Sequence, residues 1–153
     1  MADLKVTLTE ALTINGYDQG ASNTKTISGI VESTKRILTI TTAECVIATF
    51  STAVASAGHY IAADVRYIRF TNLDTSNFIT LTLRNQDNDE VAIKLDAGQS
   101  FIWNGDNNNG MTAIMNATQD ADAASSSNFG SLTNIQADAD TASCNLEMFI
   151  ASV

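Results

Sequence analysis

The chain contains no proline among its 153 residues. Proline is one of the residues with which natural proteins protect the exposed edges of β-sheets, because it removes a backbone hydrogen-bond donor. A chain that forms sheets without proline must cover their edges in another way. Pairing with further copies of the same subunit is one such way, so the absence of proline favours an oligomer.

Charged residues are few and unevenly distributed. They make up 16% of the chain, and the formal net charge is −9. Residues 1–94 contain ten acidic and eight basic residues, whereas residues 95–153 contain seven acidic residues and no basic one. Nucleic-acid binding needs a basic surface that neutralises phosphates, so this composition disfavours a nucleic-acid partner. The acidic last third is typical of a solvated surface, with a basic partner or a divalent cation as the alternatives.

Long apolar runs are also missing. No segment approaches the roughly 20 consecutive apolar residues that span a membrane, and we expect no membrane contact. Residues 1–6 alternate between polar and apolar and lack the basic-then-apolar pattern of a signal peptide. We therefore expect the protein to act in the compartment where it is made, or to travel as part of an assembly.

Histidine and cysteine are scarce, with His59, Cys45 and Cys144 as the complete set. Nothing near His59 marks a nucleophile or an orienting acid, so the sequence predicts a loop or subunit-contact residue there and not a catalyst. Three scattered residues are too few for a zinc site. The cysteines adjoin apolar strand residues, which is typical of small buried hydrophobes. A disulfide between them stays open as an alternative.

Two clusters of acidic and amide side chains, residues 87–90 and 104–110, offer the oxygen ligands that calcium prefers. Neither cluster has the spacing of a calcium-binding loop, so both favour ordinary Asn/Asp turns, with calcium as the alternative. Glycoside hydrolysis needs paired carboxylates in a sugar cleft. One Trp and three Tyr provide few aromatic side chains for such a cleft. The sequence therefore predicts no enzyme and no cofactor.

Short strands separated by turn residues dominate the chain. In residues 64–103 apolar side chains recur at every second position between clusters of Asn, Asp, Ser and Gly, which predicts an antiparallel meander with one buried face. Asn15-Gly16 predicts a tight turn with positive φ at both central positions. The same alternation predicts further strands at residues 4–8, 26–31, 36–40, 46–50, 111–115, 134–139 and 146–150. Residues 53–63 are predicted to form a loop or one short helical turn, and residues 119–128 a flexible low-complexity loop.

This pattern predicts an all-β fold, a single antiparallel sandwich or barrel over residues 1–153. Within it, residues 1–12 are predicted to hold a strand that can dock on a partner. Arg66 and Arg69 lie three positions apart on one strand and should point to opposite faces. One of them should then face a sheet partner or a neighbouring subunit, with ordinary charges of an edge strand as the alternative. The candidate contact residues are Leu4, Val6, Leu8, His59, Arg66 and Arg69.

Several phrases of the sequence resemble small structural proteins of tailed bacteriophages, especially those that infect cyanobacteria. The strongest are Tyr67-Ile68-Arg69-Phe70-Thr71-Asn72-Leu73-Asp74 and Asp96-Ala97-Gly98-Gln99-Ser100-Phe101, with weaker ones at residues 12–16, 36–39 and 48–50. The resemblance covers residues 4–103 and consists of strand and turn phrases without a mechanistic motif. It implies a virion component with a jelly-roll-like β-sandwich, assembled as a homotrimer in the host cytoplasm.

We accordingly expect a capsid decoration or cement protein. Its partners would be the major capsid protein and its sister subunits, and it would stabilise the joints between capsomers. A tail, fibre or baseplate module that binds a host glycan is the first alternative. A cellular carbohydrate-binding β-sandwich is the second, and the few aromatic residues disfavour it.

Overall fold

The computed structural model describes residues 1–112 and 130–153, and within them the chain is built of β-strands without a helix. The predicted all-β class is therefore confirmed. The strands are β1 (Ala2–Glu10), β2 (Thr13–Ile14), β3 (Tyr17–Asp18), β4 (Ala21–Ile30), β5 (Glu32–Ile40), β6 (Cys45–Ser51), β7 (His59–Ile61), β8 (Val65–Asn72), β9 (Ile79–Asn85), β10 (Glu90–Leu95), β11 (Ser100–Asn104), β12 (Leu132–Ala139) and β13 (Cys144–Ser152). The loop predicted at residues 119–128 and most of the strand predicted at residues 111–115 lie outside the described ranges.

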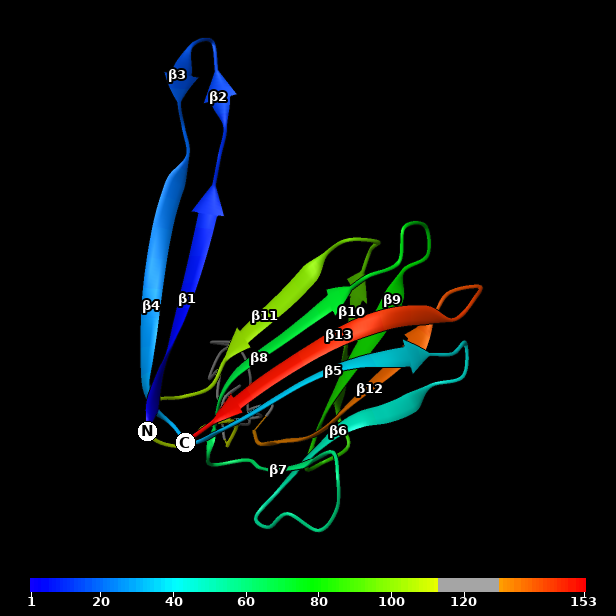
Figure 1. Ribbon diagram of the computed structural model, residues 1–153. Coiled ribbons are helices and arrows are strands. Elements are labelled where there is room, and N and C mark those ends of the chain that lie inside the picture. Colours follow the sequence, from blue (N-terminus) through cyan, green and yellow to red (C-terminus); the bar gives the residue numbers. More distant parts are fainter. Residues whose placement is uncertain (113–129) are drawn as a thin grey trace, which may run out of the picture.

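Two sheets pack face to face and form a jelly-roll-like β-sandwich (Figure 1). One sheet has the strand order β10-β9-β12-β6-β7, and the other has the order β11-β8-β13-β5. Neighbouring strands are antiparallel, except for β7, which runs parallel to β6. Segment 53–63, predicted as a loop or helical turn, contains the short strand β7.

The core lies between the two sheets and takes alternate residues from each strand. Ile68 and Phe70 of β8 meet Leu81 and Leu83 of β9 in one cluster of buried side chains. Each fully buried side chain of this size contributes about 1.5–3 kcal/mol relative to an exposed one. This alternation, with the other residues pointing outward, is what the sequence pattern indicated.

The prediction of a meander over residues 64–103 is wrong. β9 and β10 form a hairpin, but β8 pairs with β11 and β13 in the opposite sheet. The chain therefore crosses between the sheets after β8 and again before β11. Buried Asn72 stabilises the crossing, because its amide donates to the carbonyls of Asn77 (2.9 Å) and Leu95 (3.1 Å). Strands of a meander and strands of two facing sheets show the same alternation, so the pattern could not separate them.

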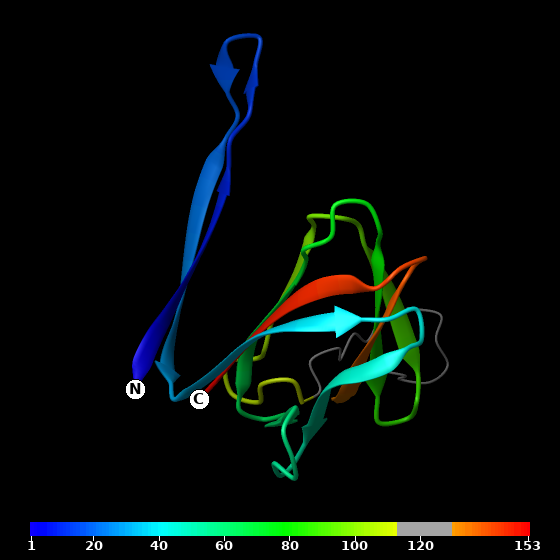
Figure 2. The same cartoon turned by 45° about the vertical axis from the view of Figure 1, so that its right-hand side comes forward.

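A long hairpin of β1 and β4 projects from the sandwich, and we call residues 1–30 the arm (Figures 1 and 2). Its tip is the two-residue turn between β2 and β3. Asn15 and Gly16 have φ angles of 52° and 82° there, as the sequence predicted. A two-stranded hairpin on its own is marginally stable in water. The arm therefore depends on what its two faces contact.

Candidate assembly surface

The root of the arm packs on the outer face of the β11-β8-β13-β5 sheet. Ile30, Tyr67 and Ala151 are buried there, and Leu4, Val6, Ile27 and Phe149 pack against them. Tyr67 and Phe149 meet edge to face, with ring centroids 5.9 Å apart. Two of the predicted contact residues, Leu4 and Val6, thus hold the arm to its own sandwich.

Beyond the root, the apolar side chains of the arm are exposed. Leu8, Leu12, Ile14 and Tyr17 have exposed fractions of 55%, 52%, 51% and 73%. Single exposed apolar residues are common on proteins, but several gathered on one projecting hairpin indicate a contact surface. The docking strand predicted from the sequence ends at residue 12 and does not include Ile14 and Tyr17. The alternation Leu12, Ile14 was the available signal.

The two faces of the arm differ in chemistry. The strand register places Leu8 opposite Asn23 and Glu10 opposite Ala21, on the face that also carries Leu4 and Val6. The other face carries hydroxyl side chains that bond across the strands, Thr7 to Thr24 at 3.0 Å and Thr9 to Ser22 at 3.1 Å. The apolar face is therefore the one that has area to bury against a partner.

Arg66 and Arg69 are engaged within their own chain. Arg69 donates to Glu147 of the neighbouring strand β13 at 2.5 Å, and Lys35 of β5 lies 3.1 Å from the other oxygen of that carboxylate. Arg66 donates to the backbone carbonyl of Ala63 at 2.5 Å. Hydrogen bonds from Arg69 and Lys35 hold the pKa of Glu147 below its ordinary value of 4.5.

This ion-pair cluster leads to a pH-dependent prediction. Because the pKa of Glu147 is lower in the folded protein than in the unfolded chain, its contribution to stability is present above pH 4.5 and is lost as the pH falls through the folded pKa. Glu147→Gln should therefore lower the melting temperature near pH 7, and its difference from wild type should shrink below pH 4.5. Thermal melts at a series of pH values test this. A difference that stays constant down to pH 3 would contradict it.

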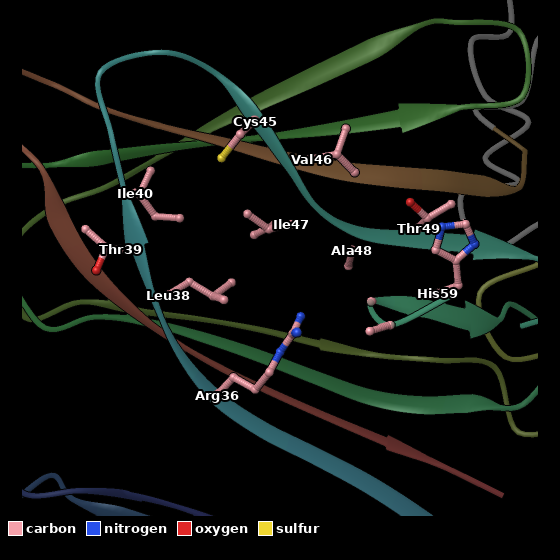
Figure 3. Close-up of a pocket in the computed structure, with 12 residues that line it drawn as sticks. Arg36, Leu38, Thr39, Ile40, Cys45, Val46, Ile47, Ala48, Thr49 and His59 are labelled. Carbon is pink, nitrogen blue, oxygen red and sulfur yellow. The ribbon is translucent and has the colours of Figure 1, made fainter. Parts of the chain in front are cut away.

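A groove lies between β5 and β6, where the two strands diverge from their connecting loop (Figure 3). Its volume is about 510 Å³. The Arg36 side chain extends into it, and His59 and Thr49 lie at the far side. Arg36 spans the groove, since a Cβ built on Gly58 would lie 3.7 Å from its Nη2 atom. Apolar side chains form the inner part, namely Leu38, Ile40, Ile47 and Ala48.

The groove continues along the free edge of β5. A second hollow of about 280 Å³ shares Arg36 and His59 with the first and adds Glu32 and Thr34. On its other side β5 pairs with β13 over its full length. Among the described residues no strand pairs with the groove-side edge of β5. The groove is therefore an open side of the sandwich, and the unpaired edge of β5 forms one of its walls.

The acidic clusters form turns. The Asp106 carboxylate accepts hydrogen bonds from the backbone of Asn108 (2.8 Å) and Asn109 (2.9 Å), which lower its pKa. Within residues 1–112 and 130–153, no three His, Cys, Asp or Glu side chains gather as a metal site would require. Cys45 and Cys144 do not bond to each other; Cys144 is buried as predicted, whereas Cys45 is exposed, so the prediction was wrong for it.

The structure does not bring the six predicted contact residues together. Leu4 and Val6 of the arm and Arg69 of β8 line one hollow at the root of the arm. Leu8 lies farther along the arm, Arg66 elsewhere on β8, and His59 in the groove. Arg36 was not among the residues predicted from the sequence. Its signal was the alternation of Arg36 with Leu38 and Ile40, which places a cation on the inward face of β5.

No helix within the described ranges has the length and apolar character of a membrane span. The chain matches no protein-family model, and no curated protein is significantly similar to it.

Proposed function

We propose that this protein is a virion structural protein, a capsid decoration protein that attaches to neighbouring protein subunits through its arm. The observation that carries the proposal is the projecting hairpin, which is fixed to the sandwich at its root and exposes Leu8, Leu12, Ile14 and Tyr17 beyond it. Covering these exposed apolar side chains with a partner lowers the free energy of the complex. The arm would then attach the sandwich to the neighbouring subunits.

Attachment through an arm suits a repeated shell. Stable interfaces bury about 1,200–2,000 Å² in total, and a hairpin of this length together with one face of a sandwich can supply a share of that area. Because the sites on a shell repeat, linked copies bind more tightly than a single copy does. The predicted resemblance of residues 4–103 to structural proteins of tailed phages implies the same role and stays a prediction.

The first test is the copy number in purified virus particles. Quantitative mass spectrometry should find the protein in numbers that match the symmetry of the major capsid protein. A few copies per particle would instead support the alternative, a tail, fibre or baseplate module that binds a host glycan. Complete absence from the particles would overturn both assignments.

The second test concerns the tip of the arm. A variant with Leu12→Ser, Ile14→Ser and Tyr17→Ser should bind shells that lack the protein at least tenfold more weakly than wild type, because it removes the exposed apolar contacts. Binding is measured by co-sedimentation of purified protein with such shells.

The matched control carries Leu73→Ser and Val91→Ser, two exposed apolar residues of the sandwich. It should bind as wild type does. Both variants should keep the wild-type melting temperature, since surface substitutions of this kind rarely change stability by more than about 0.5 kcal/mol. If the tip variant binds shells with full affinity, the arm is not the attachment surface.

A further inference from the structure

We propose that the groove beside β5 receives the arm of a second copy of this chain, and that Glu10 of the partner subunit pairs there with Arg36. The inference rests on the proposed function, attachment through the arm, and names one partner and one surface for it. The middle of the arm would contact the sister subunit, which leaves the tip free for the shell.

The groove-side edge of β5 is unpaired among the described residues. An edge strand presents a row of free backbone donors and acceptors, and an added strand from another chain is a recognised way to satisfy them. The groove along this edge is lined by Leu38 and Arg36 on the β5 wall. A strand placed there would fill the open side of the sandwich.

Arg36 brings a positive charge into the groove. The other cations of the sandwich are engaged: Lys35, Arg69, Arg84 and Lys94 pair with carboxylates, and Arg66 donates to a carbonyl. Arg36 has no acidic partner among the described residues, and its Nε atom is buried without a hydrogen bond. A buried donor of this kind favours a ligand that brings an acceptor, above all a carboxylate.

The side chains of β1 and β5 match in order and in chemistry. β1 presents Leu8 and then Glu10 on its apolar face, and both are exposed. On its groove side β5 presents Leu38 and then Arg36. Antiparallel pairing that sets Leu8 beside Leu38 also sets Glu10 beside Arg36, because side chains on one face recur every second residue. The Glu10 side chain has no hydrogen-bond or ion-pair partner among the described residues.

A second copy suits this contact better than an unrelated chain. Each copy both offers an arm and presents a groove, so the contact can close into a ring or a reciprocal dimer. Residues 1–30 carry three acidic and two basic residues, so the arm is nearly neutral although the chain as a whole has a net charge of −9. The arm can therefore approach a second sandwich with little of the repulsion that two such bodies would feel.

The experiment is a charge exchange followed by sedimentation velocity at 1–50 μM protein and low salt. Wild type should form a closed oligomer. Glu10→Arg and Arg36→Glu should each weaken association at least tenfold, and the double variant should recover most of it. Asp3→Arg is the matched control, since it makes the same charge change on the same strand away from Glu10, and it should change association less than twofold. Every variant should keep wild-type circular dichroism.

A mixture of the two single variants should associate more tightly than either alone, because the arm of each fits the groove of the other. Failure of that mixture or of the double variant to recover association would overturn the proposal. So would a monomeric wild type at 50 μM. An inward-pointing cation can also serve to repel added strands. In that case Arg36→Leu would strengthen association and Glu10→Arg would leave it unchanged, which also overturns the proposal. None of these outcomes decides the shell-binding test of the arm tip.

Discussion

Leu81→Asp should abolish folding. Leu81 is completely buried on β9, between Ile93 of the edge strand β10 and Ala137 of β12. A carboxylate placed there without a partner costs several kcal/mol. A domain of this kind has a total stability of about 5–15 kcal/mol, so the substitution removes most of it. We expect the variant to lack a cooperative thermal transition in circular dichroism.

Val91→Asp provides the control for this prediction. Val91 lies on the adjacent edge strand β10 and is exposed. The same carboxylate there stays in water and should change the free energy of unfolding by about 0.5 kcal/mol or less. If Leu81→Asp unfolds in a cooperative transition close to that of wild type, the side chain at position 81 does not point into the core.

Gly110→Ala should destabilise the sandwich by about 3 kcal/mol. Gly110 has a φ of +58°, and a Cβ built on it would lie 2.3 Å from the carbonyl oxygen of Ala62 and 2.7 Å from the carbonyl carbon of Ala63. Both atoms belong to the backbone, and the Ala62 oxygen also accepts a hydrogen bond from Met111 at 2.7 Å. The neighbours therefore cannot move aside at little cost. Urea denaturation measures the loss.

Gly98→Ala separates this clash from the cost of the left-handed backbone alone. Gly98 has a similar φ of +73°, but a Cβ there would meet no atom within 4 Å. Its substitution should cost about 1 kcal/mol, the usual penalty for a side chain in that region of φ. Equal losses for the two variants would show that the close approach of Gly110 to Ala62 and Ala63 contributes nothing.

Both stability predictions bear on the assembly surface, because the sandwich holds the arm in place. Tyr67 and Phe149, which carry the root of the arm, are on strands whose inward residues Ile68 and Ile150 belong to the main core. Loss of the core would release the arm. The arm variants should therefore be compared only where the melting temperature is that of wild type.

The candidate surface was predictable in part. The alternation of Leu4, Val6 and Leu8 marked a strand with one apolar face, and the structure contains that strand. The alternation could not show that Leu4 and Val6 pack on the sheet of their own sandwich while Leu8 lies beyond that sheet. That division depends on where the sandwich ends along the arm, and only the packing of Tyr67 and Phe149 against the arm decides it.

Most of the strands and the Asn15-Gly16 turn could be predicted from the local sequence, whereas β7 could not. Residue alternation, β-branched side chains and Asn15-Gly16 act locally, through backbone preferences that need no distant partner. Only the three-dimensional packing shows which sheet each strand joins, because a strand with one buried face has the same alternation in a meander and in two facing sheets. It also decided that Arg36 lies in an open groove without an acidic neighbour, since the surroundings of an inward side chain come from strands far away in the chain.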